Sequence, residues 1–581
     1  MRRVKILLAA ACVLAPMVVP VSPVAVYAAP SVVATGAALP FMPLPAAVAP
    51  PAGASKYVGV TPLRLADTRP TASGYGGFTD VSGDTIRVGI IGRAGVPANA
   101  TAAVLNVTIA GTSAWSFATV FPGSTPLPSP LTSSLNADAS GRVIANLVHV
   151  KIGPDGSANI YRSASMGLVV DLVGVYVPVT APSKEGRLVT RPDGAKRVLD
   201  TRGSRPINAT ETFSVDVSSA GVPTSASAVV VNLTVVTANS GFWSAFPANQ
   251  GFTGTSSLNL DTNGQTRAGQ AIVNLVGTNT FNVYTENGGN LLVDVVGYFT
   301  GTDEPTTSTD GLYVPSAPSR VFDSRQLRLL APWSGSTYEF SPGGGPTVAA
   351  AVLNITATLP WDIGFVTAYP ARVARPNSSN LNISGVPQTI ANHSIVRVST
   401  AGVALFTQGG THLIADVAGW YLGAPSAASL APPANPVYNP NPAVAVSVPK
   451  IGVYVGVKAG GGSLDAIANQ GYAATWSDIN TVAAPGNLML FGHRTTGSAP
   501  FRNLDAMRVG DAFSIIGSDG NSYNYQIMDI SVTLPSYSAI QRLANPYGLI
   551  TAQLVACSKL NGTATSTAYR IVVTGRLASI T

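Results

Sequence analysis

The strongest constraint on the fold of this 581-residue chain is an internal repeat. The block Arg-x-x-Asp-[Thr/Ser]-Arg occurs three times, at residues 64–69, 197–202 and 320–325. The period of this repeat exceeds 120 residues, which is too long for a solenoid unit and matches a whole domain. Most of the chain is therefore predicted to fold as three tandem copies of one domain.

Four further blocks follow in the same order in every copy. The first block is Val104–Thr108, which matches Val231–Thr234 and Val352–Thr356, and the second is Ser133–Asn136, which matches Ser256–Asn259 and Ser378–Asn382. The third is Ile144–Asn146, which matches Ile272–Asn274 and Ile390–Asn392, and the fourth is Val170–Gly174, which matches Val293–Gly297 and Ala415–Gly419. Short apolar runs separated by Gly, Pro, Asn and Ser dominate each copy, with little helical periodicity. Each copy is predicted to be an all-β sandwich or barrel.

The full predicted order of segments follows from these repeats and from two stretches rich in Pro and Ala. The segments are a signal peptide (1–28), a Pro/Ala-rich spacer (29–56), three β repeat domains (57–180, 187–301 and 312–422), a Pro/Ala-rich linker (423–446) and a C-terminal domain (447–581).

The N-terminus has the features of an export signal. Met1–Lys5 is basic, residues 6–21 are mostly apolar, and small residues near Ala28 offer a cleavage site. The alternative is an uncleaved membrane anchor, although Pro16 and Pro20 make a poor spanning helix. The protein is therefore expected to be exported and to work outside the cell or at the cell wall surface, with anchoring by this segment left open.

Charge limits the choice of partners. The net charge is +7, and no Lys/Arg cluster interleaved with aromatic residues occurs beyond the first five residues. Nucleic acid is therefore not expected as a partner. A basic balance suits an anionic cell wall instead.

The repeated polar residues have two interpretations. Asp67, Asp200 and Asp323 belong either to a ligand site or, as we expect, to ion pairs and turns formed with the flanking arginines. The same register in every copy favours a structural role for the asparagines of the Asn-x-Thr triplets, which are Asn106, Asn232 and Asn354.

Aromatic residues recur four apart near a proline in each copy, and three histidines lie elsewhere in the repeats. The aromatic pairs suit either sugar stacking or, as we expect, core packing; they are Phe117 and Phe121, Phe242 and Phe246, and Phe365 and Tyr369. The histidines occur in different contexts and are interpreted as structural; they are His149, His393 and His412.

The C-terminal region contains one cysteine, one histidine and an arginine in suggestive places. Cys557 ends a β-type run, His493 follows another, and Arg570 begins the next. A thiolate is the nucleophile in thiol catalysis, and an imidazole can exchange protons with it and with a leaving amine. An arginine can stabilise the oxyanion that forms when an amide is attacked. The predicted roles are nucleophile for Cys557, general acid for His493, and oxyanion or substrate clamp for Arg570.

The whole of 447–581 resembles a sortase, the cysteine transpeptidase of Gram-positive surfaces. The motifs that carry the resemblance are Ile451–Val453, Pro485–Asn487, Gly492–Thr496, Ala499–Phe501, Leu504, Val509–Asp511, Leu554–Cys557 and Tyr569–Arg570. The Gly-His-Arg-Thr-Thr block is most similar to class E, with class F as an alternative. Sortases usually carry threonines where this chain has Gln553 and Ala556, which puts substrate specificity and rate in question.

The resemblance implies a closed eight-stranded β-barrel and a transpeptidase. No Asp/Glu cluster in the sequence suggests an obligatory metal, and no cofactor is expected. The resemblance also implies cleavage after the threonine of an LPxTG- or LAxTG-like sorting signal through a Cys thioester. A cell-wall precursor or a pilin amine would then accept the acyl group. The repeats resemble a module common in secreted actinobacterial proteins, which implies cell-surface work and leaves a cell-wall glycan as a candidate partner.

Two other functions stay open on the sequence alone. One is a surface adhesin or wall-binding protein whose barrel is inactive or degenerate. The other is a thiol hydrolase that releases a free acid. Papain-like hydrolases place the cysteine before the histidine, and the order His493, Cys557 argues against them.

Overall fold

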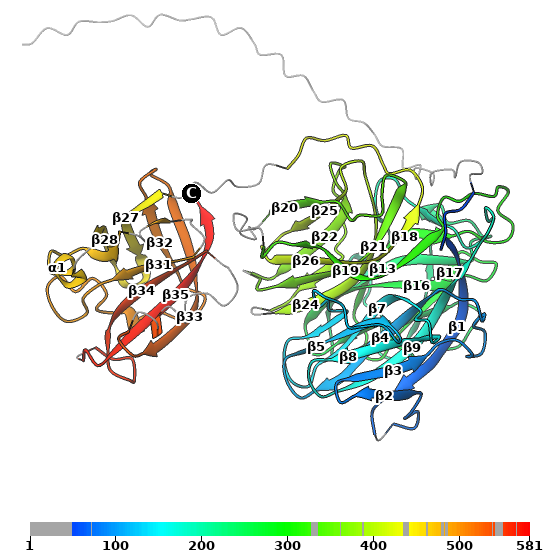
Figure 1. The fold of residues 1–581 in the computed structure, drawn as a ribbon, viewed down its shortest axis with the longest axis horizontal. Helices are drawn as coiled ribbons and strands as arrows, with labels where there is room; N and C mark the ends of the chain where they lie inside the picture. Colours follow the sequence, from blue (N-terminus) through cyan, green and yellow to red (C-terminus); the bar gives the residue numbers. More distant parts are fainter. Residues whose placement is uncertain are drawn as a thin grey trace, which may run out of the picture. The chain divides into compact units, whose positions relative to one another are not determined.

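The computed structural model describes residues 49–581, except for 71, 327–334, 361, 386–387, 434–440, 461–462, 478–480, 483–485, 537–538, 541–549 and 565. The predicted signal peptide, most of the spacer and part of the linker therefore lie outside the described residues. Almost every described element is a β-strand, which confirms the all-β prediction (Figure 1). No helix within the described residues has the length and apolar character needed to cross a membrane.

Each repeat has an inner and an outer layer of antiparallel strands, and repeat 1 (57–180) shows the plan. The inner layers of repeats 1 and 3 are joined into one eight-stranded sheet by the pairing of Ser55 with Tyr313. The inner sheet of repeat 1 runs β1 (Ser55–Asp67), β9 (Met166–Pro178), β4 (Ala102–Thr112) and β7 (Val143–Lys151). Its outer sheet runs β2 (Phe78–Ser82), β3 (Thr85–Gly89), β8 (Ser157–Arg162), β5 (Ser116–Pro122) and β6 (Leu135–Ala137). Alternate residues from both sheets, such as Leu105, Val120 and Ile160, form one hydrophobic core.

Repeats 2 (187–301) and 3 (312–422) follow the same plan. The inner strands of repeat 2 are β10 (Leu188–Thr190), β11 (Lys196–Asp200), β18 (Asn290–Phe299), β13 (Ala228–Ala238) and β16 (Gln265–Asn274), and the outer strands are β12 (Thr212–Asp216), β17 (Thr280–Thr285), β14 (Gly241–Pro247) and β15 (Leu258–Leu260). In repeat 3 the inner strands are β19 (Tyr313–Asp323), β26 (His412–Leu422), β21 (Val348–Thr358) and β24 (Thr389–Arg397), and the outer strands are β20 (Thr337–Phe340), β25 (Val403–Thr407), β22 (Gly364–Pro370) and β23 (Leu381–Ile383).

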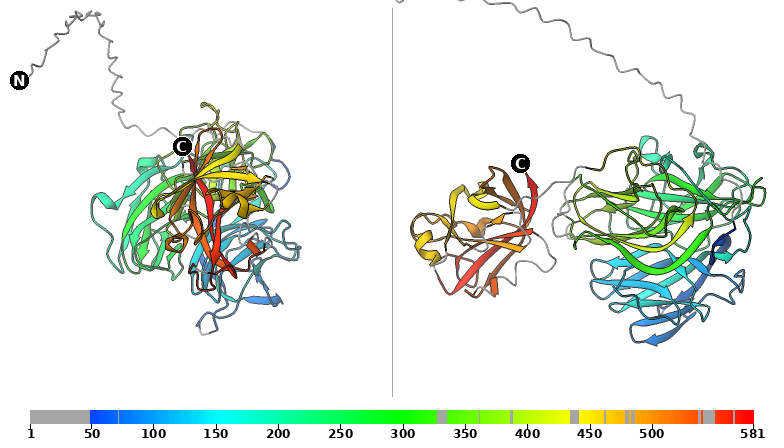
Figure 2. Two further views of the ribbon diagram at one scale, coloured as in Figure 1. Left: turned by 90° about the vertical axis from the view of Figure 1, so that its left-hand side faces the viewer. Right: turned by 45° about the horizontal axis from the view of Figure 1, so that its top comes forward.

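The three repeats also share a central core, formed by the other faces of the inner sheets. Equivalent residues of each repeat meet there, namely Tyr57, Leu188 and Tyr313 with Tyr176, Phe299 and Tyr421. Gly174 makes room for this packing, because a Cβ atom at that position would lie 2.4 Å from the ring of Tyr57. The inner strands are thus buried on both faces, which explains their long apolar runs. We call residues 55–422 the repeat body; Figure 2 shows it from two further sides.

The repeated asparagines join the repeats in a closed cycle. Each side-chain amide donates to the backbone carbonyl of the first serine in a Ser-[Ser/Asn]-Leu-Asn block of the next repeat. The pairs are Asn106 with Ser256, Asn232 with Ser379 at 2.6 Å, and Asn354 with Ser133 at 2.5 Å. The Asn-x-Thr triplets therefore have the structural role that their register predicts, at the seams between repeats 1 and 2, 2 and 3, and 3 and 1.

The Arg-x-x-Asp-[Thr/Ser]-Arg block is an ion-pair motif, as the structural interpretation predicts. In repeat 2, Arg197 pairs with buried Asp294 at 2.9 Å, and Arg202 pairs with Asp200 at 2.6 Å. The Arg202 hydrogen bond lowers the pKa of Asp200 to about 2, whereas burial raises the pKa of Asp294. The same pairs recur in repeats 1 and 3.

The structure corrects one of the sequence equivalences. Strand pairing sets Leu147 opposite Asn106, His393 opposite Asn354, and Gln270 opposite Asn232. The structural counterpart of Asn146 and Asn392 is therefore Gly269, whereas Asn274 corresponds to Lys151. The Ile-Val-Asn sequence at 272–274 resembles the blocks of the other two repeats but occupies a different position in the strand.

The C-terminal region forms a closed eight-stranded barrel, as the sortase resemblance implies. The strands run in the order β28 (Val453–Gly460), β29 (Ala473–Trp476), β31 (Gly486–Phe491), β34 (Ile550–Ser558), β35 (Tyr569–Ile580), β33 (Ser522–Thr533), β32 (Ala512–Gly517) and β27 (Asn441–Val448). Pairing of β27 with β28 closes the barrel, and β30 (Thr481–Val482) adds to β27. Helix α1 (Leu464–Ala468) follows β28; 3-10 turns lie at Thr201–Gly203, Ser218–Ala220, Pro449–Ile451 and Leu504–Ala506.

Candidate active site

Cys557 lies near the end of β34, between β31 on one side and β35 on the other. It is half-buried, and it is a free thiol, the only one among the described residues. Its neighbours Leu554 and Ala556 face the barrel core, whereas Val555 packs in a separate cluster on the outer face. Because side chains alternate along a strand, Cys557 lies on the same outer face as Val555.

Strand register brings His493 to the level of Cys557. Strands β31 and β34 are parallel, with Phe491 opposite Val555, and the Gly492 N–H donates to the Val555 carbonyl at 3.1 Å. His493 and Cys557 lie two residues beyond Phe491 and Val555, respectively, so His493 lies beside Cys557 on the outer face. The His493 ring is held from the other side by Asn469, whose Oδ1 lies 3.0 Å from Nε2.

Arg570 lies on the opposite side of the cysteine. It is the direct cross-strand partner of Cys557 in the antiparallel pair of β34 and β35, so the two side chains share one face. The Nη1 group of Arg570 donates to the carbonyls of Thr567 and Tyr569 at 2.8 and 3.0 Å. The structure thus brings all three predicted site residues to one end of three neighbouring strands.

A buried arginine joins the loop that carries the imidazole to the strand end that carries the thiol. Arg494 is 2% exposed, and its Nη1 donates to the carbonyls of Cys557 at 3.3 Å and Gly562 at 2.9 Å. It also donates to the Arg502 carbonyl and pairs with Asp505 at 2.7 Å. The residue that follows the histidine therefore fixes the backbone on both sides of the site.

A small buried apolar cluster lies next to Cys557 on the outer side of β34 and β35. Val555 and Val572 are cross-strand partners there, and they pack with Met489 and Ile540. These four side chains are almost fully buried, so the cluster supports the strands that carry Cys557 and Arg570.

Gln553 and Ala556, which replace the usual sortase threonines, lie on opposite faces of β34. Gln553 is fully buried on the outer face and bonds Asn487, the Ile540 carbonyl and Thr574. Ala556 faces the barrel core, so the hydroxyl that it lacks would point away from the Cys557 side chain.

The sequence did not single out Asn469 or Asp505. Asn469 lies 24 residues before His493 and ends helix α1, where no motif marks it. Arg494 was present in the Gly-His-Arg motif, but its burial and its bonds to the Cys557 and Gly562 carbonyls could not be derived from the motif. Among the described residues, no group of three His, Cys, Asp or Glu side chains is arranged to hold a metal ion.

The family comparison decides the nature of this region, because residues 446–578 match the sortase domain model. Residues 446–578 form a sortase domain. Similar solved structures include sortase C1 of Streptococcus agalactiae in complex with MTSET (23% identity over 23% of this chain and 68% of that chain, TM-score 0.20). Sortase E1 of Streptomyces coelicolor with a tripeptide in its active site matches at 22% identity over 24% and 90% of the two chains, with a TM-score of 0.21. The SrtA sortase of Actinomyces oris matches at 18% identity over 26% and 88%, with a TM-score of 0.22. A search of curated proteins finds no match to this chain.

Proposed function

We propose that the chain is a cell-surface, sortase-type cysteine transpeptidase with Cys557 as its nucleophile, His493 as its general acid and Arg570 as its oxyanion or substrate clamp. The observation that carries the proposal is the shared level of these three side chains on β31, β34 and β35 within a sortase domain. The predicted segment boundaries, the signal peptide and the class E or F assignment belong to the same proposal.

The proposed reaction has two acyl transfers. The Cys557 thiolate attacks the threonine carbonyl of an LPxTG- or LAxTG-like signal, and the Thr–Gly bond breaks. His493 gives a proton to the departing glycine amine, leaving a thioester on Cys557. A cell-wall precursor or pilin amine then attacks the thioester and gives up a proton to His493, so a new amide forms, the thiolate is released and the imidazole regains the proton it lost.

Arg570 suits the charge that develops in both steps. An attacked carbonyl becomes an oxyanion, which needs a preorganised donor. The contacts of Nη1 with two backbone carbonyls orient the guanidinium. Its Nε and Nη2 groups bond no other described residue and so are available to an oxyanion.

A quenched fluorescent peptide containing Leu-Pro-x-Thr-Gly or Leu-Ala-x-Thr-Gly, incubated with an added amine, tests the proposal. We expect cleavage between Thr and Gly and a peptide–amine product by mass spectrometry. Cys557→Ala, His493→Ala and Arg570→Ala should each lower the rate by at least about 10³-fold, the order expected for groups that act as a unit.

Lys559→Ala is the matched control, because Lys559 is exposed and only two residues beyond the cysteine. It should retain the wild-type rate. Release of free acid without any amine product would favour the thiol hydrolase. Failure to cleave either signal would favour an adhesin with an inactive barrel.

A further inference from the structure

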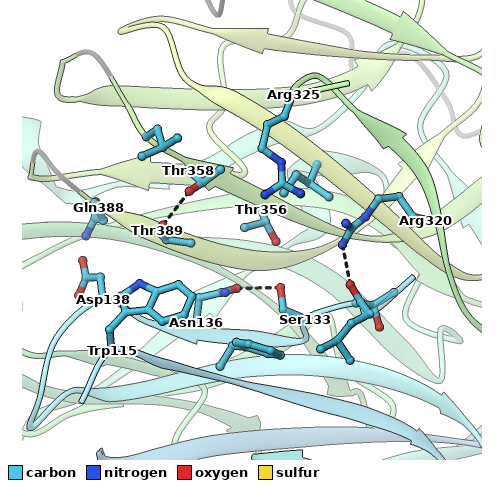
Figure 3. A pocket seen from close by; sticks show the side chains of 15 residues that line it. Trp115, Ser133, Asn136, Asp138, Arg320, Arg325, Thr356, Thr358, Gln388 and Thr389 are labelled. Atoms are coloured by element: carbon cyan, nitrogen blue, oxygen red, sulfur yellow. Dashed lines mark hydrogen bonds between the residues drawn. The ribbon is translucent and has the colours of Figure 1, made fainter. Parts of the chain in front are cut away.

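A cavity of about 380 Å³ opens at the seam between repeats 1 and 3 (Figure 3). We call it the seam pocket; its lining includes Trp115, Phe117 and Asp138 from repeat 1 with Arg325, Thr356 and Gln388 from repeat 3. Cavities of only about 30 Å³ lie beside the repeated asparagines at all three seams: beside Asn106, beside Asn232 and beside Asn354. The three seams share their asparagine contacts and these small cavities, and the seam pocket is additional to them.

The hydrogen bonds across the seam beside the seam pocket differ from those at the seam of repeats 1 and 2. At the seam of repeats 1 and 2, the Asp261 carboxylate accepts the Val143 N–H at 2.6 Å and ties the two repeats together. The equivalent residue at the seam pocket is Asp138, which is bonded at 2.6 Å by Arg142 of its own repeat. The Asp261 carboxylate thus bonds across its seam, whereas the equivalent Asp138 carboxylate bonds an arginine of its own repeat.

The seam pocket also contains hydroxyl groups with unmet hydrogen bonds. Thr108 and Thr234 are the equivalent threonines of the Asn-x-Thr triplets, and their hydroxyls lie 3.4 Å from Ser256 Oγ and 3.3 Å from Asn232 Nδ2. Thr356 is 2% exposed, and its hydroxyl has no hydrogen-bond partner among the described residues; the same holds for Thr132. Burying an unpaired hydroxyl costs roughly 1–3 kcal/mol, so a bound polar ligand or water is expected there.

An exposed indole lies at the same cavity. Trp115 is 55% exposed, and its ring meets Phe117 edge to face with centroids 6.2 Å apart. The equivalent positions of the other repeats hold Ser240 and Ile363. A tryptophan exposed in one copy only is therefore not required by the repeat fold.

Charge balance at the seam pocket argues against an ionic ligand. Arg325 is paired with Asp323 at 2.7 Å, and Arg320 with Asp416 at 2.9 Å. With Asp138 held by Arg142, every charged group that lines the cavity has an opposite charge beside it. A neutral ligand rich in hydroxyl groups matches a balanced set of donors and acceptors next to an aromatic face.

We propose that the seam pocket binds a neutral saccharide, with one face of a sugar ring against Trp115 and its hydroxyls bonded by Gln388, Asp138 and the Thr356 hydroxyl. The site is independent of the barrel chemistry, and it would tether the chain to a glycan.

The test is saturation-transfer NMR and calorimetric titration of the full chain with four neutral tetrasaccharides. These are β-1,4-linked glucose, β-1,4-linked N-acetylglucosamine, α-1,4-linked glucose and α-1,6-linked mannose. We expect at least one to bind with a dissociation constant on the order of 0.1–1 mM. Trp115→Ala should weaken that binding at least about tenfold, whereas Ile363→Ala, at the equivalent exposed position, should change it less than about twofold.

Thr356→Val separates binding from folding. The Thr356 hydroxyl bonds no described residue, so its removal should leave the unfolding temperature unchanged or raised while weakening saccharide binding about threefold or more. The proposal is overturned if none of the four tetrasaccharides binds at about 10 mM, or if Trp115→Ala and Thr356→Val bind as tightly as the wild type. Peptide cleavage by the barrel should be the same in all of these variants, so failure here leaves the transpeptidase proposal standing.

Discussion

The repeat body and the C-terminal barrel use polar residues in opposite ways. In the repeat body, Arg, Asp and Asn side chains occur three times and satisfy one another within and across the repeats. In the barrel, Cys557, His493 and Arg570 occur once, at the ends of three neighbouring strands. Recurrence marks residues that hold the fold together, and a single occurrence at a strand end marks residues available for chemistry.

The same contrast holds inside the repeat body. Phe121, Phe246 and Tyr369 recur and are buried, whereas their partners four residues earlier, Phe117, Phe242 and Phe365, are only half-buried, so core packing holds for one member of each pair. Trp115 has no aromatic counterpart at the equivalent described positions, and it is exposed beside the seam pocket. Departures from the repeat are therefore the places to look for ligands.

Arg494→Ala should have the largest effect, because it removes a buried guanidinium that joins the loop of His493 to the strand end of Cys557. Loss of charge-assisted bonds to the Cys557 and Gly562 carbonyls should destabilise the barrel by about 2–4 kcal/mol. Peptide cleavage should fall about 100-fold or more, since about 1 Å of displacement can cost that much.

Urea unfolding and the fluorescent peptide assay measure both effects. Arg502→Ala is the control, because the Arg502 side chain is exposed and only its carbonyl receives the Arg494 bond. Wild-type activity in Arg494→Ala would show that this arginine does not position the site.

Acid should weaken the repeat body through its buried histidines. Burial lowers the pKa of His393 to about 3 and that of His412 to about 4. In the unfolded chain these histidines have a pKa of about 6.5, so below that pH the unfolded state binds more protons than the folded state. Stability should therefore fall as the pH drops from about 6.5 toward 4, by up to about 3 kcal/mol per histidine.

His393→Leu tests this acid response with a residue that repeat 1 already uses, since Leu147 holds the equivalent position. Calorimetric unfolding of the full chain between pH 7 and 4 should show a shallower loss of stability in the variant. Identical pH slopes in variant and wild type would mean that His393 does not contribute.

Removing the cross-seam asparagines should give a graded loss of stability. Asn232→Ala loses the bond to the Ser379 carbonyl and a longer one, of 3.3 Å, to the Thr234 hydroxyl, and should cost about 1 kcal/mol. Asn354→Ala loses the Ser133 bond and also the bond that its Oδ1 accepts from Asn146 at 3.0 Å, so it should cost about 2 kcal/mol. Equal unfolding temperatures for the two variants would contradict this order.

Ala556→Thr should have the smallest effect, and no benefit for catalysis. The added atoms would enter the barrel core, which should cost about 1 kcal/mol through overpacking. The cleavage rate should not rise. A rate increase would mean that the missing hydroxyl acts at the site after all.

Much of this architecture could be predicted from the sequence. Turn-rich apolar runs indicate β structure, and motif order along 447–581 indicates the barrel and its three site residues. The ion pairs of Asp200 and its equivalents also follow from neighbouring arginines in the same short block.

The arrangement of the repeats could not be derived in this way. Tandem repeats do not reveal that Tyr57, Tyr176 and Tyr421 meet in one shared core, because that contact depends on packing between copies. His149 and His393 occur in different contexts, yet their rings stack across a seam with centroids 4.7 Å apart. The seam pocket likewise joins residues that lie far apart in the chain.

The most direct test of the central claim is the intact mass of the full chain after incubation with a Leu-Pro-x-Thr-Gly peptide in the absence of an amine. The account predicts one added mass equal to the peptide cut after its threonine, mapped to Cys557 and discharged by hydroxylamine. Cys557→Ala should show no such mass. An acyl group on any other residue, or a wild-type chain that gains no mass with the peptide or its Leu-Ala-x-Thr-Gly counterpart, would contradict it.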